Sequence, residues 1–466
     1  MRKVDVFVAE SYANSVSVSN EIGNVKGIAN LPFSTKALKE VAKRASADFT
    51  LLQVKDTSIR LGYLALERML QVAEATGASM IYADRYKETK EGTVQHPTIS
   101  YQAGSLRDDF DFGALILVPT QLLKEVADKM DKEYEYAAIY DLRLRLSELG
   151  DIQRINEFLY TEVETDDRAS GKKIFDYVDP KNRDVQVEME EACTAYLKRI
   201  GAKLEGEPKK VDFNAYKSEF PVEASVIIPV RNRAKTIKDA VKSALTQKAS
   251  FEYNVIVVDN HSTDGTSEIL DEISKEEKRL IVIHPERTDL GIGGCWNMAI
   301  MDQRCGKFAV QLDSDDMYAN PDTLTKVVEI FNEEKCAMVV GTYKMTDFNL
   351  NEIAPGIIDH KEWTPDNGRN NALRINGLGA PRAFFTPLLR EQKLPNTSYG
   401  EDYALGLAFS RNYHIGRIYD VIYLCRRWED NSDATLSVEK MNKNNFYKDS
   451  IRTWELQARL QMNKGK

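Results

Sequence analysis

The chain has 466 residues and a formal net charge of -9, so we expect two to three domains and no broad nucleic-acid-binding surface. Its five cysteines form no CxxC pair, which is typical of reduced thiols and not of a disulfide or zinc framework. No apolar run approaches the roughly 20 residues of a membrane span, and the N-terminal MRKVDVFVAE predicts a strand, not a signal peptide. These features predict a cytoplasmic protein, and they leave open its docking on the inner face of a membrane.

A polar region divides the chain into two halves. Residues 161–222 contain the loop-like TEVETDDRASGKK, the polar GEPKKVDFNAYKSEFPVEA and, between them, DVQVEMEEACTAYLKRI with apolar residues at helical spacing. We interpret this region as a linker with one bridging helix. The sequence therefore predicts a domain over 1–160, a linker over 161–222 and a second domain over 223–466.

The second half alternates between strand and helix patterns. ASVIIPV, NVIVVD, LIVIH and KFAVQLD are apolar β runs with helical stretches between them, which predicts a mostly parallel sheet with helices on both faces. Ligands of such sheets bind beyond the carboxyl ends of the strands. Polar clusters follow three of the strands, at 229–233, 259–264 and 313–316. We expect these clusters to converge on one crevice.

The cluster at Asp313, Ser314, Asp315 and Asp316 follows directly after an apolar strand. Like charges this close repel one another, so the cluster needs an external stabiliser. One reading is a helix start with Asn320 as the cap, but this explains the residues after the cluster better than the cluster itself. The other reading is that Asp313 and Asp315 hold a hard divalent cation and the polyphosphate that accompanies it.

Five motifs resemble those of family 2 glycosyltransferases of the GT-A fold. They are SVIIPVRNR, VIVVDNHSTDGT, DLGIGGCWNMAI, QLDSDD and YGEDYALGLAFSR, in that order and at roughly the family spacing, between Ser225 and about Ser437. The resemblance implies a Rossmann-like α/β GT-A catalytic domain. It also implies an inverting, metal-dependent transfer of sugar from a nucleotide-sugar, with UDP as the expected nucleotide, to a glycan or lipid-linked acceptor in surface polysaccharide biosynthesis.

The resemblance also implies roles for individual residues. Asp315 and Asp313, in a DXD motif, would hold Mn²⁺ or Mg²⁺, and Asp402 would be the general base with Glu401 beside it. The other implied site residues are Pro229, Val230, Arg231, Asp259, Asn297, Asp313 and Ser314 on the nucleotide-sugar side, and Arg382, Arg426, Arg427 and Trp428 on the acceptor or diphosphate side.

The residues by themselves leave other roles open. Asp259 could cap the helix that begins near Gly265, and Glu401 and Asp402 could compensate a helix dipole. Residues 426–428 could form a surface loop.

The front half of the chain aligns with the back half in several segments. LQVKDTS (52–58) aligns with VQLDSDD (310–316), and further segments pair 78–83 with 336–341, 113–125 with 379–391, 136–140 with 399–403 and 152–155 with 415–418. Apolar and turn positions match. The strand that ends in PVRN and its helix have no counterpart in this alignment.

The chemical positions differ between the halves. Lys55 and Thr57 stand where the second half has Asp313 and Asp315, and Ala138 and Ile139 replace the Glu401–Asp402 pair. We therefore predict that residues 1–160 form a smaller, degenerate GT-A-like α/β domain without a metal or nucleotide site. It would hold the catalytic domain, bind acceptor glycan or form a homodimer.

Two other functions compete with transfer. A sugar nucleotidyltransferase shares the fold class, but its first strand would end in a glycine-rich loop, and IIPVRNRA has none. A non-catalytic glycan- or nucleotide-binding scaffold is the alternative from a different class, although both acidic clusters of the second half argue against it. Neither the donor sugar, the acceptor nor the choice between UDP and GDP follows from the sequence.

Overall fold

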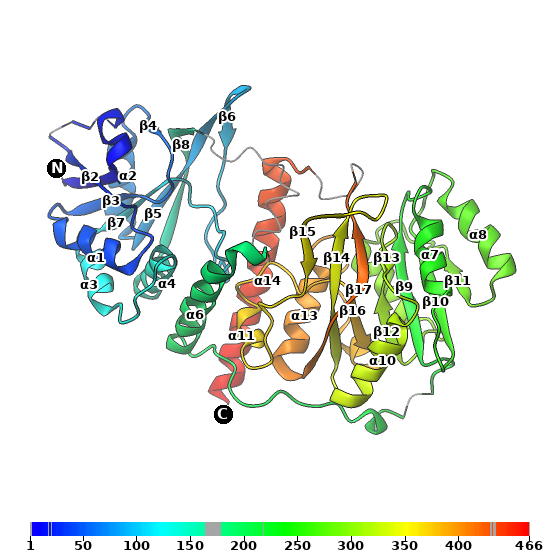
Figure 1. The fold of residues 1–466 in the computed structure, drawn as a ribbon. Helices are drawn as coiled ribbons and strands as arrows, with labels where there is room; N and C mark the ends of the chain where they lie inside the picture. Colours follow the sequence, from blue (N-terminus) through cyan, green and yellow to red (C-terminus); the bar gives the residue numbers. More distant parts are fainter. Residues whose placement is uncertain are drawn as a thin grey trace. The chain divides into compact units, whose positions relative to one another are not determined.

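The computed structural model describes residues 2–16, 18–19, 21–163, 179–217, 219–428, 431 and 435–465. These residues form two compact units (Figure 1). One unit contains the first 163 residues together with 182–203 and 435–465, and the other contains 204–428. The C-terminal segment, assigned by sequence to the second domain, thus packs with the first unit. No helix in the described ranges combines the length and apolarity of a membrane span.

The first unit contains a sheet of eight strands with the order β2-β1-β3-β7-β5-β8-β4 and with β6 paired to β5. Its strands are β1 (Val4–Ala9), β2 (Gly23–Ile28), β3 (Phe49–Gln53), β4 (Ile59–Leu61), β5 (Met80–Thr89), β6 (Gly92–His96), β7 (Leu115–Pro119) and β8 (Ile152–Val163). Its helices are the 3₁₀ helix η1 (Glu10–Ser15), α1 (Thr35–Arg44), α2 (Ala65–Thr76), α3 (Thr120–Lys129), α4 (Ala138–Leu149), α6 (Arg183–Arg199) and α14 (Val438–Lys464).

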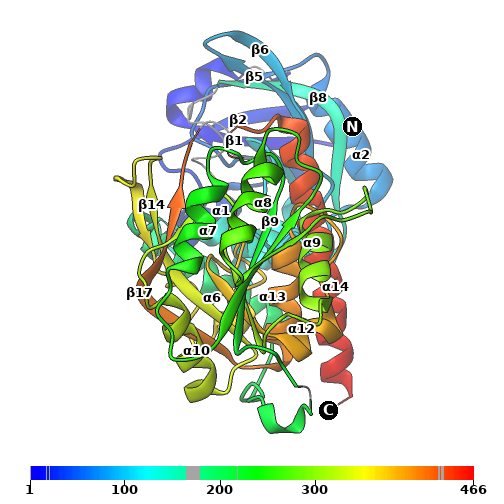
Figure 2. The ribbon, with the colours of Figure 1, turned by 90° about the vertical axis from the view of Figure 1, so that its right-hand side faces the viewer.

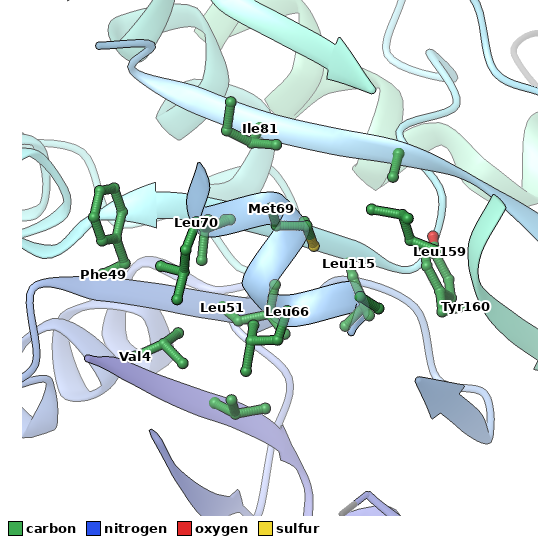
Figure 3. Packing of buried hydrophobic residues seen from close by; sticks show 14 of the residues in the cluster. Val4, Phe49, Leu51, Leu66, Met69, Leu70, Ile81, Leu115, Leu159 and Tyr160 are labelled. Carbon is green, nitrogen blue, oxygen red and sulfur yellow. The ribbon is translucent and has the colours of Figure 1, made fainter. Parts of the chain in front are cut away.

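Two apolar cores cover the two faces of this sheet, because successive side chains of a strand point to opposite faces. On one face, Leu66, Met69 and Leu70 of α2 pack near Leu51 and Leu115 of the strands (Figure 3). On the other face, α1, α3 and α4 pack on alternate residues of the same strands. The unit is therefore a three-layer α/β/α structure.

The second unit contains a sheet of nine strands with the order β11-β10-β9-β12-β16-β14-β17-β13 and with β15 paired to β14. Its strands are β9 (Ala224–Val230), β10 (Tyr253–Asp259), β11 (Leu280–Ile283), β12 (Phe308–Gln311), β13 (Met317–Tyr318), β14 (Met338–Thr346), β15 (Glu352–Ile358), β16 (Arg382–Phe385) and β17 (Ile415–Arg426). Its helices are α7 (Ile237–Leu245), α8 (Thr266–Glu276), α9 (Ile292–Met301), α10 (Thr323–Glu334), α11 (Gly368–Asn371), α12 (Thr386–Gln392) and α13 (Glu401–Asn412).

Helices cover both faces of this sheet too, which confirms the predicted α/β class. In Figure 2, α7 and α9 lie on opposite sides of β9, and α9 packs beside α12 and α13. The sheet is mixed: β9 to β12 are parallel, whereas β16 runs antiparallel to both of its neighbours, β12 and β14. The parallel strands β9, β10 and β12 therefore end at one edge of the sheet.

The two sheets repeat one another strand for strand in the segments that the alignment paired. The order β3-β7-β5-β8-β4 matches β12-β16-β14-β17-β13, with the same parallel and antiparallel pairs. The register of β5 on β8 shifts between Ala83 and Arg85, and that of β14 on β17 shifts at the aligned positions between Val340 and Tyr343. Shared bulges at aligned positions indicate a common architecture.

The expectation that the first strand has no counterpart is wrong. β1 pairs in parallel with β2 and β3, as β9 pairs with β10 and β12. The described residues of the first unit contain η1 between β1 and β2, where the second unit has α7, and no equivalent of α8 and β11. The alignment missed β1 because a buried strand needs only apolar residues, so its sequence can diverge freely.

Candidate active site

A pocket of about 260 Å³ lies at the edge of the second sheet where β9 and β12 end. Residues from α9, β16 and the start of α13 form its other walls. It is lined by Pro229, Arg233, Ile292, Trp296, Gln311, Asp313, Ser314, Asp315, Arg382, Phe384, Leu394, Glu401 and Asp402. Both acidic clusters of the second half therefore contribute to one pocket.

The polar clusters after β9 and β10 lie against each other at this edge. The backbone nitrogen of Asn232 donates a hydrogen bond to the hydroxyl of Ser262 at 2.9 Å. Of the predicted residues here, Pro229 lines the pocket, Val230 is buried in the strand and Arg231 is exposed. Of the predicted residues on the nucleotide-sugar side, Pro229, Asp313 and Ser314 thus line the pocket.

The acidic cluster after β12 is electrostatically strained. Burial raises the pKa of Asp313, and Asp315 and Asp402 raise it further, although a hydrogen bond from Gln311 at 2.9 Å opposes the change. Burial together with the charge of Asp315 raises the pKa of Asp316 well above its ordinary value. A cation beside these carboxylates would stabilise their charged forms.

Asp315 is held by three contacts from distant parts of the chain. Its carboxylate lies 3.5 Å from the Arg233 guanidinium and accepts a hydrogen bond from Asn431 at 3.2 Å. Its backbone carbonyl accepts a hydrogen bond from Arg426. The neighbouring Ser314 is buried, and its carbonyl accepts from the Thr236 hydroxyl. The loop that carries the predicted metal ligands is therefore anchored on both sides.

The donor atoms of this loop fit a hard divalent cation such as Mn²⁺ or Mg²⁺. Carboxylate oxygens are the ligands that these ions prefer, and Mg²⁺ in particular is usually bound by one or two carboxylates together with substrate phosphates. Within the described part of the chain, no three His, Cys, Asp or Glu side chains are grouped closely enough to hold a metal by themselves.

Asp402 lies at the first turn of α13, opposite the acidic loop. One carboxylate oxygen is 2.9 Å from the Arg382 guanidinium, and the other accepts a hydrogen bond from the backbone of Tyr403 at 2.7 Å. The Asp402 side chain is 30% exposed, whereas Glu401 is buried. Asp402 is thus the more accessible of the two acids to a substrate in the pocket.

Two predicted nucleotide contacts are engaged within the protein. The Asp259 carboxylate accepts hydrogen bonds from the backbone of Ser262 and the hydroxyl of Ser267, near the start of α8. The carboxamide of Asn297 both donates to and accepts from the backbone of Leu394, at 2.8 and 2.9 Å. Asp259 therefore joins the loop after β10 to the first turn of α8 without capping that helix. Asn297 fastens α9 to the segment before α13.

Arg426 is a buried anchor and not part of a surface loop. Its guanidinium lies 3.0 Å from Asp239, and its backbone nitrogen donates to Asp316 at 2.8 Å. Beyond it, the backbone of Arg427 continues the pairing with β14, and the Trp428 ring lies 5.5 Å from that of Phe348. Arg426 thus fastens the acidic loop to the end of β17.

Six pocket residues were not among the predicted ones: Arg233, Ile292, Trp296, Gln311, Phe384 and Leu394. Gln311 accepts a hydrogen bond from the backbone of Arg382 at 3.1 Å and donates to Asp313, so it links β16 to the acidic loop. Arg233 lies in SVIIPVRNR, three residues after β9, and Gln311 is the first residue of QLDSDD and the last of β12. Their position at or just beyond the strand ends is a signal that could have identified them.

The second unit is similar in sequence to known glycosyltransferases. Residues 225–392 match the family model of Glycosyl transferase family 2. A poly(ribitol-phosphate) beta-glucosyltransferase of Bacillus spizizenii is 26% identical over 233 residues, which cover 48% of this chain and 35% of that protein. A putative teichuronic acid biosynthesis glycosyltransferase, TuaG of Bacillus subtilis, is 35% identical over 121 residues, which cover 26% of this chain and 46% of that protein. The matched regions are thus less than half of either relative.

A similar solved structure is that of S. aureus TarS 1-349 in complex with UDP-GlcNAc. It is 22% identical, covers 51% of this chain and 70% of that chain, and has a TM-score of 0.41.

Proposed function

We propose that the protein is an inverting, metal-dependent glycosyltransferase, because residues 225–392 match the family model of Glycosyl transferase family 2. It takes a sugar from a nucleotide-diphosphate sugar, with UDP as the nucleotide, and passes it to a glycan or lipid-linked acceptor of a surface polysaccharide. The observation that carries this proposal is the pocket that combines Asp313 and Asp315 with Arg382 and Asp402. The names of the relatives, which include polymer-directed transferases, support the acceptor class.

Asp313 and Asp315 would hold Mn²⁺ or Mg²⁺ in this reaction. When bound, the ion supplies Lewis-acid stabilisation of the negative charge that develops on the leaving diphosphate. Gln311 orients the carboxylate of Asp313, and Arg233 lies close enough to Asp315 to contact a phosphate bound beside it. These residues would form the side of the pocket that binds the cation and the phosphates.

Asp402 would remove the proton of the acceptor hydroxyl. The acceptor oxygen attacks the anomeric carbon from the face opposite the diphosphate, the bond to the diphosphate breaks, and the proton passes to the Asp402 carboxylate. Arg382 holds that carboxylate at 2.9 Å and so fixes its direction. Displacement in a single step inverts the anomeric configuration.

Donor cleavage by the purified protein tests the proposal. We expect UDP to be released from a UDP-sugar in the presence of Mn²⁺, faster when the acceptor is present, and not after chelation with EDTA. A panel of UDP- and GDP-sugars would identify the nucleotide. Tight nucleotide binding without cleavage of any donor would contradict the proposal and favour a nucleotide-binding scaffold. Cytoplasmic localisation, docking on a membrane surface and homodimer formation stay predictions.

A further inference from the structure

The first unit contains a cavity of about 800 Å³ that none of the predicted site residues lines. It lies where β1 and β2 end, beside the start of α1 and the segment before α4. It is lined by Ala9, Glu10, Ser11, Ile28, Ala29, Asn30, Leu31, Phe33, Ser34, Lys36, Ala37, Glu40, Val41, Asp56, Glu135 and Tyr136.

This cavity has the place in the first sheet that the active-site pocket has in the second. β1 and β3 correspond to β9 and β12, and the cavity opens at the ends of β1 and β2 and includes Asp56 of the loop after β3. Open α/β sheets bind ligands at this edge. The position alone therefore indicates a binding site, whereas the residues decide what it can bind.

The loop after β3, residues 54–58, cannot bind a metal ion and a diphosphate in the way proposed for the second unit. Lys55, which replaces Asp313, forms an ion pair with Asp111 at 2.8 Å. The carboxamide of Gln53, which aligns with Gln311, donates to the backbone carbonyls of Lys55 and Thr57 at 2.7 and 2.8 Å and so holds the loop closed. An ammonium group at the former ligand position repels a divalent cation.

Two aromatic side chains, those of Phe33 and Tyr136, line the cavity, and the backbone of each of these residues is hydrogen-bonded. Phe33 and Tyr136 are 38% and 47% exposed. The carbonyl of Phe33 accepts a hydrogen bond from Ala138 at 2.9 Å, which joins the two aromatic segments. Glu188 of α6 accepts a hydrogen bond from the backbone of Tyr136 at 2.7 Å. Exposed rings on a fixed backbone offer flat apolar surfaces at little conformational cost.

The charged residues of the cavity are mostly acidic. Glu10, Glu40, Asp56 and Glu135 are carboxylates, and Lys36 is the only cation in the lining. This charge repels phosphate and other polyanions, but carboxylates accept strong hydrogen bonds from hydroxyl groups. Pockets of this size that combine flat apolar walls with a few polar groups bind small organic ligands.

We propose that this cavity binds an uncharged oligosaccharide. The faces of the sugar rings pack on Phe33 and Tyr136, and sugar hydroxyls donate to the surrounding carboxylates. The site is non-catalytic, and it goes beyond the proposed transfer because it does not require that the second unit be active. The edge of the first sheet that corresponds to the pocket edge of the second sheet would thus be a glycan-binding site.

Titration of the full chain with cellotetraose, maltotetraose and chitotetraose tests the proposal by calorimetry and saturation-transfer NMR. We expect at least one of them to bind, and the Phe33→Ala/Tyr136→Ala variant to bind it at least tenfold more weakly. Tyr63→Ala is the matched control, because Tyr63 is 93% exposed in the same unit and lies outside the cavity. This control should bind as the wild type does.

Three further measurements make the test specific. Addition of UDP and Mn²⁺ at saturating concentrations should leave oligosaccharide binding unchanged. Loss of oligosaccharide binding would indicate that the sugar binds in the second unit. The double variant Asp56→Asn/Glu135→Gln should also weaken oligosaccharide binding. It changes the protein less and replaces the Phe33→Ala/Tyr136→Ala variant as the test if that variant misfolds. Failure of all three sugars to bind, or tighter binding of a sulfated heparin tetrasaccharide, would overturn the proposal.

Discussion

The Arg382 guanidinium lies 2.9 Å from the Asp402 carboxylate and joins the start of β16 to the first turn of α13. The backbone of Arg382 also donates to Gln311, which donates in turn to Asp313. The candidate base and the candidate metal ligand are therefore connected through one series of contacts. A change at one end should affect the geometry at the other.

Replacing the candidate base should separate chemistry from binding. We expect Asp402→Asn to keep donor affinity and to lower turnover by roughly 10²–10⁴-fold, the usual contribution of a positioned base. Single-turnover assays beside calorimetric titration of UDP would measure both quantities. If Asp402→Asn keeps its turnover and Glu401→Gln loses it, Glu401 and not Asp402 is the general base.

Replacing Arg382, which positions the Asp402 carboxylate, should affect kcat more than KM. In Arg382→Gln the Asp402 carboxylate loses its partner at 2.9 Å, and a displaced catalytic group can cost about 10²-fold in rate. We expect kcat to fall by roughly that factor with the donor KM nearly unchanged, and Arg382→Lys to recover part of it. A rise in donor KM at constant kcat would instead assign Arg382 to diphosphate binding.

The chain should bind one metal–nucleotide complex. Titration of the wild type with UDP and Mn²⁺ should give a stoichiometry of one per chain, since Lys55 occupies the corresponding position in the first unit. Asp315→Asn should abolish this binding. Asp322→Asn, at the N-terminal end of α10, is the control and should bind normally. A second nucleotide site that survives in Asp315→Asn would contradict the view that the first unit has lost its site.

A buried ion pair should stabilise the first unit. Glu162 on β8 lies 2.8 Å from the fully buried guanidinium of Arg85. Glu162→Gln should lower the free energy of unfolding by roughly 3 kcal/mol, because the buried guanidinium of Arg85 then keeps, among the described residues, only Asp111 as a carboxylate partner. Glu157→Gln on the same strand breaks an exposed pair with Arg68 and should cost less than about 1 kcal/mol. Urea denaturation would compare the two, and equal effects would refute the distinction.

Acid should weaken the same cluster through Asp111. Burial opposes its ionisation, but Arg85 and Lys55 hold the pKa of Asp111 well below its usual value. The pKa of Asp111 in the folded state is therefore below the unfolded value of about 3.9. Its contribution to the free energy of unfolding is complete above that pH and is lost as the pH falls through the folded-state pKa. The stability difference between wild type and Asp111→Asn should narrow below about pH 4. A difference independent of pH would exclude this ionisation as the cause.

Local patterns in the sequence determined much of this protein. The apolar runs predicted β9, β10, β11 and β12 of the second sheet. The acids at 313–316 and 401–402 were found because strand ends and helix starts are visible in sequence. The alignment of the two halves, segment by segment, paired stretches that have the same places in the two sheets. These features depend on neighbouring residues, whose spacing the chain itself sets.

Other features were decided only by the tertiary structure. The contacts of Arg382 with Gln311 and Asp402, and of Arg233 with Asp315, join segments whose proximity follows from the order of the strands. The same order revealed β1 as the counterpart of β9, although a buried strand keeps its place with almost any apolar sequence. Hydrogen-bond partners depend on which segments the sheet brings together, and no local spacing encodes that choice.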